Sequence, residues 1–343
     1  MIRPMLSIII TTYDLRRRRH LEQVIASLES QNVKDFEFIL VVEHSHEMYR
    51  YFVAYLKESN LRLSSVIFVG ARRGISASRN AGIASAHSEI VAILDDDVVV
   101  PSGWAAAVIK LFGDRSVAAA TGPVVPLWED GAPVWLRPEF HWLIGCSTWS
   151  DKNSISEARN VWGANMAFRR EKLMAVGGFS ERLGGVQGKR LHGEENNLCI
   201  RLRRDAGGRI VFTPEMRVFH AVPGSRFNVR YIIRSSFDMG RTRVIYIGHE
   251  NALEDETRVA EEILKDTFQS AVRMLWSPKP WAPTFFLSVV VLFFVGFGYV
   301  YGLATKGPMP SKRTQVACPM KGVCPAASHG LHNFFSVLPK SAP

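Results

Sequence analysis

Cysteine is scarce in this sequence. The 343 residues include four cysteines, which is too few for a disulfide framework in a chain of this length. Cys318 and Cys324 lie near one another in a proline-rich stretch, but no further Cys/His pair completes a zinc site. We interpret both, together with Cys146 and Cys199, as ordinary thiols, which fits a reducing compartment. The length suffices for roughly two domains whose cores need no cross-links.

Two phosphate-binding motifs are also missing. The sequence contains neither a Walker P-loop nor a GxGxxG fingerprint, so it supports neither a P-loop ATPase nor a dinucleotide enzyme.

The net charge of +10 suits nucleic acid, anionic lipid or a phosphate-rich substrate. Because no nucleic-acid-binding module is recognisable, we expect no nucleic acid partner.

The N-terminal residues lack the order of a signal peptide. A short apolar run precedes the arginines at residues 16–19, whereas a signal peptide carries its charge before the apolar stretch. We therefore expect a buried strand at residues 6–11.

Strand-like and helix-like segments alternate along the first hundred residues. The segments expected to form buried strands are residues 6–11, 36–42, 66–69 and 90–94, and those expected to form helices are residues 21–31, 48–59 and 75–86. This alternation predicts an α/β fold with a mostly parallel, Rossmann-like sheet flanked by helices. Ligands in such folds bind outside the carboxyl ends of the strands.

The next part of the chain is less regular. We expect helices at residues 103–112 and 194–205, and strands at residues 117–123, 161–169, 210–212 and 217–220. The segment at residues 126–156 reads as a loop over the site and contains Trp128, Trp135, Trp142 and Trp149. These indoles either stack on an acceptor sugar, dip into lipid, or pack as a lid on the core.

Three adjacent carboxylates, Asp95, Asp96 and Asp97, follow the apolar strand at residues 90–94. Such a cluster is tolerated when a divalent cation neutralises it, and Mg²⁺ and Mn²⁺ bind carboxylates together with substrate phosphates. An exposed acidic turn is the alternative, but the position at the end of a strand favours a site.

A second pair of carboxylates, Glu194 and Glu195, opens a predicted helix. The helix dipole alone would stabilise them, whereas a functional interpretation is a general base for a hydroxyl nucleophile. Arg79, within the small-residue segment 74–82, offers a phosphate or sugar contact.

Taken in order, these motifs resemble the family 2 glycosyltransferases of GT-A fold. The matching segments are residues 7–13, 74–82, 94–97, 163–170, 177–179, 193–202 and 218–220. The resemblance covers about residues 5–245, and it is strongest to the membrane-associated branch typified by glucosyl-dolichyl-phosphate glucuronosyltransferases.

The resemblance implies a nucleotide-sugar site at the strand ends. Its expected donor contacts are Thr11, Tyr13, Glu43, Arg79, Asp95 and Asp96. In the family an Asp usually stands at the position of Glu43, which leaves base recognition open.

The resemblance also implies a divalent metal, Mn²⁺ or Mg²⁺. Asp97 and Asp95 would bind it and His220 would complete the site, although a lone histidine is more often structural. Glu195, or alternatively Glu194, would be the base of an inverting transfer. The family's usual Glu-Asp pair is Glu-Glu here.

The C-terminal region predicts contact with a membrane. Residues 280–305 contain no charged residue, and this apolar stretch is long enough to cross a bilayer. The alternatives are a buried core helix or a hairpin that lies on the membrane. The arginine-rich segment 226–247 and the segment 254–275 read as amphipathic helices, suited to an anionic membrane surface or to solvent. The number of lysines and arginines on each side of the apolar stretch slightly favours a cytoplasmic tail. The expected function instead favours a cytoplasmic catalytic domain. Both could be cytoplasmic if the apolar stretch re-entered the membrane or lay in its plane.

The expected organisation follows from these features. We expect a catalytic domain at residues 1–225, which divides into a nucleotide-sugar half at about 1–100 and an acceptor half at about 101–225. Membrane-proximal helices at 226–279 follow it. A transmembrane or membrane-embedded segment at 280–305 and a flexible tail at 306–343 complete the chain.

The function expected is transfer of one sugar from a nucleotide-sugar, a UDP-sugar, to a polyprenyl-linked or glycan acceptor on the cytoplasmic face of the cell membrane. The Gln-x-x-Arg-Trp signature of processive synthases is absent, which favours transfer of a single sugar. A soluble or protein acceptor, a nucleotidyltransferase, and a non-catalytic sugar-nucleotide-binding membrane scaffold are the alternatives.

Overall fold

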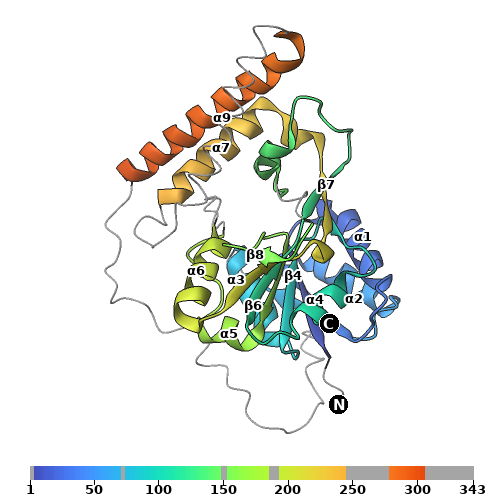
Figure 1. The fold of residues 1–343 in the computed structure, drawn as a ribbon. Coiled ribbons are helices and arrows are strands. Elements are labelled where there is room, and N and C mark those ends of the chain that lie inside the picture. The colour runs from blue at the N-terminus through green and yellow to red at the C-terminus, as the bar shows by residue number, and fades with distance from the viewer. Residues whose placement is uncertain (1–3, 71–73, 148–152, 185–192, 245–277, 306–343) are drawn as a thin grey trace, which may run out of the picture. The chain divides into compact units, whose positions relative to one another are not determined.

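The computed structural model describes residues 4–70, 74–147, 153–184, 193–244 and 278–305 (Figure 1). The expected helix at residues 254–275 and the tail at 306–343 lie outside the described residues, as does Trp149.

The molecule is organised around an eight-stranded sheet. Its strands are β1 (Leu6–Thr12), β2 (Phe36–Glu43), β3 (Ser64–Val69), β4 (Ile90–Leu94), β6 (Val117–Thr121), β8 (Ser156–Glu157), β9 (Asn165–Arg169) and β10 (Arg209–Phe212). They lie in the order β3-β2-β1-β4-β9-β6-β10-β8. The first four are parallel, and β10 is parallel to β6, whereas β9 runs antiparallel between β4 and β6, and β8 runs antiparallel at the edge. The expected mostly parallel α/β sheet is confirmed.

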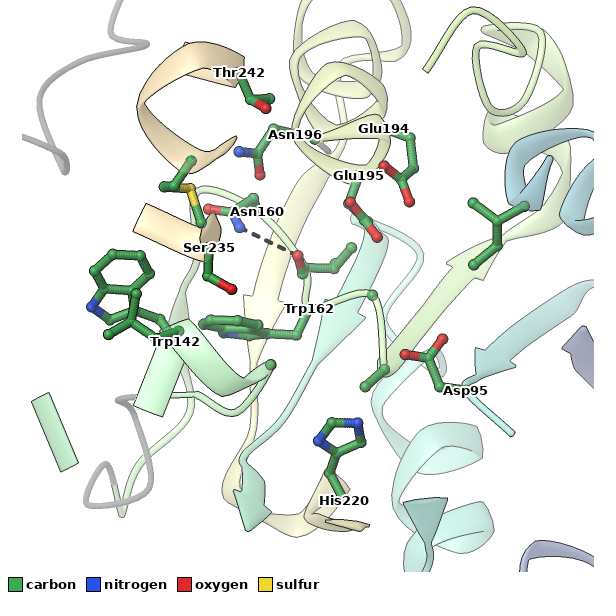
Figure 2. A pocket seen from close by; sticks show the side chains of 18 of the residues that line it. Asp95, Trp142, Asn160, Trp162, Glu194, Glu195, Asn196, His220, Ser235 and Thr242 are labelled. Carbon is green, nitrogen blue, oxygen red and sulfur yellow. Dashed lines mark hydrogen bonds between the residues drawn. The ribbon is translucent and has the colours of Figure 1, made fainter. Parts of the chain in front are cut away.

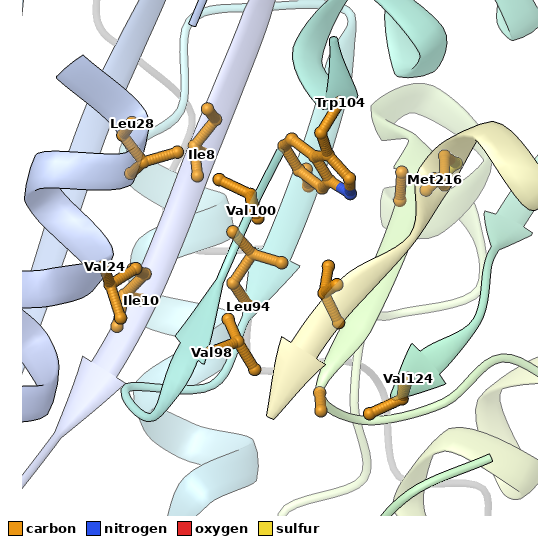
Figure 3. Packing of buried hydrophobic residues seen from close by; sticks show 14 of the residues in the cluster. Ile8, Ile10, Val24, Leu28, Leu94, Val98, Val100, Trp104, Val124 and Met216 are labelled. Atoms are coloured by element: carbon orange, nitrogen blue, oxygen red, sulfur yellow. The ribbon is translucent and has the colours of Figure 1, made fainter. Parts of the chain in front are cut away.

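Helices cover both faces of this sheet, because the side chains of each strand alternate between two hydrophobic clusters. In β1, Ile8 and Ile10 enter one cluster and Ile9 the other. Figure 3 shows the first cluster, where Val24 and Leu28 pack against β1. The helices of the first face are α1 (Arg18–Glu29), α2 (His46–Lys57) and α4 (Trp104–Leu111), and those of the second are α3 (Ile75–Ser85), α5 (Arg170–Ala175) and α6 (Glu194–Ala206).

The chain reverses its direction of winding between β1 and β4. From β1 the sheet grows outward through β2 to β3, and it then continues with β4 on the other side of β1. Such a switch point opens a crevice at the carboxyl ends of the strands, which is where ligands bind in open α/β sheets. Asp95–97 leave β4 at this point.

A second, three-stranded sheet brings a distant histidine to the same edge. It consists of β5 (Val98–Val99), β11 (Val218–Val222) and β7 (Val124–Trp128). In its register His220 pairs with Val98, and the backbone N–H of Ala221 donates to the carbonyl oxygen of Asp97 over 2.8 Å. The pairing therefore fixes His220 beside Asp97.

Most expected elements agree with the structure within a few residues, but the region after residue 120 differs. The expected irregular segment at residues 126–156 begins inside β7 and contains the 3₁₀ helix η2 (Pro138–Ile144). The strand expected at residues 161–169 forms only as β9, after a turn closed by the Trp162–Asn165 bridge. The short 3₁₀ helices η1 (Leu15–Arg17), η3 (Pro214–Met216) and η4 (Gly224–Phe227) complete the fold.

Among the described residues, two helices follow the sheets and pack along one another (Figure 1). They are α7 (Val229–Arg243) and α9 (Pro278–Thr305). Within the part of the chain that the structure describes, the stretch Phe285–Thr305 has a mean hydropathy of 2.2 and is long and apolar enough to cross a membrane, judged by length and composition alone.

Candidate functional site

A cavity of about 420 Å³ lies at the carboxyl edge of the sheet. Its walls come from the end of β4, from the segment before β9, from the first turn of α6 and from α7 (Figure 2). Of the residues expected from the sequence, it brings together Arg79, Asp95, Asp97, Glu194, Glu195 and His220.

Asp97 is buried among two arginines and a histidine. Its Oδ2 lies 3.2 Å from Arg17 Nη1 and 3.3 Å from Arg226 Nη2, and its Oδ1 lies 3.2 Å from His220 Nε2. Burial alone would raise the pKa of Asp97, but His220, Arg17 and Arg226 outweigh it and hold the pKa below its usual range. Asp97 is therefore ionised at neutral pH.

Asp96 faces the protein rather than the cavity. The Thr12 hydroxyl donates to its Oδ2 over 2.6 Å, and Arg17 contacts its Oδ1. Burial raises the pKa of Asp96 to about 6, and Arg17 partly offsets this. Arginine side chains of the protein itself therefore neutralise part of the charge of the aspartates. The sequence had suggested that a metal ion alone does so.

Three of the site's side chains fit a divalent cation. One ligand atom each from Asp95, Asp97 and His220 lies within 4.8 Å of the others. Asp97 Oδ1 is buried, and among the described residues its one close polar neighbour is His220 Nε2. Two carboxylates and an imidazole can hold a divalent cation, so the residues fit the divalent metal, Mn²⁺ or Mg²⁺, that the sequence predicted.

Arg79 connects the two groups of carboxylates. Its side chain is only 2% exposed, and it lies over the ring of Phe179 at 5.3 Å. Nη2 lies 3.4 Å from Asp95 Oδ1, while Nη1 lies 3.1 Å from Glu194 Oε1 and 3.2 Å from Glu195 Oε1. The buried Arg79 side chain therefore links the end of β4 to the start of α6.

The two glutamates differ in their surroundings. Glu194 is buried, whereas the Glu195 side chain is 16% exposed and points into the cavity (Figure 2). Burial raises the pKa of Glu194 to about 8, the charge of Glu195 adds to this, and Arg79 opposes it. Glu194 therefore carries a proton at neutral pH. A side chain at Gly163 would overlap Glu195 Oε1, so glycine there leaves room for that carboxylate.

The side of the cavity opposite the sheet is aromatic and amphipathic. Trp142, Trp162 and Asn160 lie there together, and α7 adds Ser235 and Thr242 (Figure 2). Aromatic faces stack on sugar rings, and hydroxyl and amide groups bond to sugar hydroxyls. Trp142, from the tryptophan-rich segment, thus lines the site.

Four expected donor contacts do not line this cavity: Asp96, which faces the protein, and Thr11, Tyr13 and Glu43. Thr11 and Tyr13 lie at the end of β1, where Tyr13 is exposed. Glu43, at the end of β2, is buried and accepts a hydrogen bond from the backbone N–H of Gly74 over 2.6 Å. These residues share the carboxyl edge of the sheet with the cavity but are not part of its wall.

Sequence reasoning missed Arg17 and Arg226 as site residues. Arg17 ends the 3₁₀ turn after β1, and Arg226 lies in η4. The available signal for Arg17 was its place after a buried strand, at the edge where ligands bind. For Arg226, 129 residues from Asp97, only the pairing of β11 with β5 reveals the contact.

The sheet, its flanking helices and the carboxylate site define a glycosyltransferase of GT-A fold. The model of the family "Glycosyl transferase family 2" matches residues 7–177, and the chain belongs to this family. This confirms the resemblance found in the sequence.

Similar proteins include enzymes whose names contain lipid-linked sugars. The glucosyl-dolichyl phosphate glucuronosyltransferase of Haloferax volcanii is 27% identical over 305 residues, which are 87% of this chain and 96% of the relative. The GalNAc(5)-diNAcBac-PP-undecaprenol beta-1,3-glucosyltransferase of Campylobacter jejuni is 31% identical over 100 residues, which are 29% of this chain and 32% of the relative. The mannosyltransferase PcManGT of Pyrobaculum calidifontis, solved with GDP-Man and Mn²⁺, shares the fold with a TM-score of 0.60 at 18% identity, covering 89% of each chain.

Proposed function

We propose that this protein transfers a single sugar, with inversion, from a UDP-sugar to a polyprenyl-linked acceptor at the cytoplasmic face of the membrane. The observation that carries the proposal is the convergence of Asp95, Arg79 and Glu195 in one cavity. Residues 1–225 form the catalytic part in this proposal, and residues 226–305 its membrane-associated part.

On the donor side, Asp95, Asp97 and His220 would hold a divalent cation. When bound, that ion supplies positive charge that stabilises the departing nucleotide diphosphate. Arg17 and Arg226 flank the same carboxylates and offer guanidinium groups to the diphosphate oxygens. In the proposal Thr11, Tyr13, Glu43 and Asp96 contact the nucleoside from the neighbouring strand ends.

On the acceptor side, Glu195 is the proposed base. Its carboxylate is directed into the cavity and is held by Arg79, so it can accept the proton of an acceptor hydroxyl that attacks the sugar. Glu194 keeps its proton at neutral pH and therefore acts as a buried support rather than as a second base. One base on the acceptor side is the requirement of a single, inverting displacement.

The lipid-linked acceptor is supported by the relatives and by α7. Two relatives carry dolichyl phosphate or undecaprenol in their names. Here α7, which packs on the apolar helix α9, forms one wall of the cavity. An acceptor sugar on a membrane lipid would thus reach Trp142 and Trp162 from the side of these helices.

The proposal is tested by calorimetric titration of UDP, GDP, CDP and dTDP into the purified full chain, with and without Mn²⁺. We expect UDP binding that needs the metal, is lost in Asp97→Asn, and persists in Asp205→Asn, a control at an exposed carboxylate at the end of α6. Binding of a different nucleotide would show that the donor is a sugar linked to that nucleotide instead of to UDP. Binding of none would overturn the proposal, and binding without transfer to any lipid acceptor would indicate a sugar-nucleotide-binding scaffold.

A further inference from the structure

The helix α9 has two different faces. Leu287, Ser288 and Val291 are buried, and the two apolar residues among them belong to the hydrophobic core of the catalytic part. The opposite face is exposed, and it is apolar along its length. Its large exposed side chains are Phe286, Val289, Phe293, Phe297 and Val300. Their spacing of three and four residues places them on one stripe of the helix.

The buried face of α9 also packs closely on α7. A side chain added at Gly240 would overlap the carbonyl oxygen of Val295, and one added at Gly298 would overlap that of Phe237. At the edge of this contact, the ring of Phe297 on the exposed stripe lies 5.7 Å from that of Phe237 on α7. Small residues that let two helix backbones touch are typical of helix pairs in membranes. This packing explains why α9 is apolar all round although one of its faces is covered by protein.

The partner helix α7 carries charge alongside this contact. Asp238 is buried and pairs with Arg241 at 3.1 Å and with Arg234 at 3.9 Å. If α9 crossed a bilayer, its apolar 21 residues would occupy the whole hydrocarbon layer. These three charged side chains would then also lie at membrane depth, which is unfavourable.

We propose that α9 does not cross the membrane but lies in the plane of one leaflet, with the stripe from Phe286 to Val300 among the acyl chains. The exposed side chains of Arg230 and Arg234 on α7 then lie at the level of the anionic headgroups. A bilayer leaflet suits this face because an unbroken apolar stripe is accompanied by cations on the adjoining helix.

This membrane placement stands independently of the sugar chemistry, because it follows from the two faces of α9 and from the charges of α7. It has a consequence for the cavity, whose wall includes Tyr231 and Ser235 of α7. With α9 in the plane of the leaflet, that wall adjoins the headgroup layer rather than the bulk solution.

Depth measurements on the full chain test the placement. We would replace Cys318 and Cys324 by serine, leave the buried Cys146 and Cys199, and introduce one cysteine at a time at Phe286, Phe293 and Val300 for a fluorescent label. The protein is reconstituted in phosphatidylcholine vesicles with a minor fraction of phosphatidylglycerol, which carry nitroxides at shallow or deep acyl positions.

We expect equal quenching at the three positions, stronger from the shallow nitroxide. A helix that crosses would instead place Phe293 roughly 10 Å deeper than the other two, from 1.5 Å of rise per residue, and that result would overturn the proposal. Absence of quenching at all three would also overturn it, because the face would then be covered by a second copy or another protein. Nucleotide binding of the same preparations separates this outcome from failure of the proposed enzymatic function.

Paired substitutions give a second readout. Phe293→Glu should weaken binding to these vesicles by roughly tenfold or more, as expected when a buried aromatic side chain is lost from an apolar phase. Leu63→Glu, which changes an exposed apolar side chain before β3, is the matched control and should leave binding unchanged. Equal binding of both variants would contradict the proposal.

Discussion

The carboxyl edge of the sheet and the α7–α9 pair are held together by opposite means. At the sheet edge, Asp95, Asp97 and the two glutamates of α6 are buried or half-buried against arginines, and charge pairing fixes their positions. Between α7 and α9, glycines and aromatic rings meet with backbone in direct contact. The first region can change its charge state and bind ions, whereas the second can only pack or come apart. In our proposals, sugar transfer and membrane anchoring are therefore divided between two kinds of interaction.

The largest effect should come from removing the proposed base of the charged region. Glu195→Gln should lower the rate of sugar transfer by about 10²–10⁴-fold, the usual contribution of a general base, while nucleotide binding persists. Glu194→Gln is the matched variant and should retain most activity, because Glu194 is already protonated at neutral pH. Transfer rates under saturating donor decide the matter, and a greater loss in Glu194→Gln would reverse the two roles.

The packed region should respond to added volume alone. Gly298→Ala places a methyl group against the carbonyl oxygen of Phe237 and should destabilise the chain by about 1–3 kcal/mol, the usual cost of overpacking. Gly296→Ala on the same helix meets nothing within 4 Å and should be neutral or slightly stabilising. Urea unfolding in detergent compares the two, and equal effects would mean that α7 and α9 do not touch here.

Another prediction concerns the pH dependence of stability. Because the pKa of Glu194 is raised to about 8 in the folded protein, the folded state keeps a proton that the unfolded chain releases at lower pH. The contribution of this group is therefore fully present below the unfolded pKa and is lost as the pH rises toward 8. Unfolding free energies at several pH values should decline less steeply over this window for Glu194→Gln than for the wild type. Parallel curves would show that Glu194 does not titrate there.

The smallest expected effect concerns Arg17. Arg17→Gln removes one cation from Asp96 and Asp97, so the affinity of the free protein for Mn²⁺ should rise by roughly threefold, about 0.7 kcal/mol, within the range of single partly exposed charge pairs. Arg16→Gln, at an exposed neighbour that pairs with Asp14, is the control and should leave the affinity unchanged. Calorimetry with Mn²⁺ alone measures both variants, and a lower affinity in Arg17→Gln would contradict the reasoning.

Local pattern was enough to predict the carboxylate groups of the site. The apolar run before Asp95 predicted a strand, and the fold rule that ligands bind at strand ends predicted where its aspartates would lie. The polar first turn of α6 likewise identified Glu194 and Glu195. Each of these inferences needed only residues that are adjacent in the chain.

Pairings between distant segments could not be predicted in the same way. The antiparallel strand β9 enters between β4 and β6, and no periodicity of its own five residues distinguishes that direction from the parallel one. The contact of Arg226 with Asp97 depends on two strands meeting 120 residues apart, and the segment after residue 226 read only as a basic helix. Such contacts depend on which distant strands pair and in which alignment, and the pattern of residues in a single sequence does not reveal that pairing.

The position of Arg79 also constrains how this protein can evolve. The same guanidinium pairs with Asp95 from one segment and with Glu194 and Glu195 from another, so an exchange of Arg79 would alter the surroundings of all three acids. A lineage that loses the arginine leaves several acids together in a nearly dry space, and it must lose acids as well. Among descendants of this gene, the arginine and the acids that carry charge should therefore be inherited or replaced together.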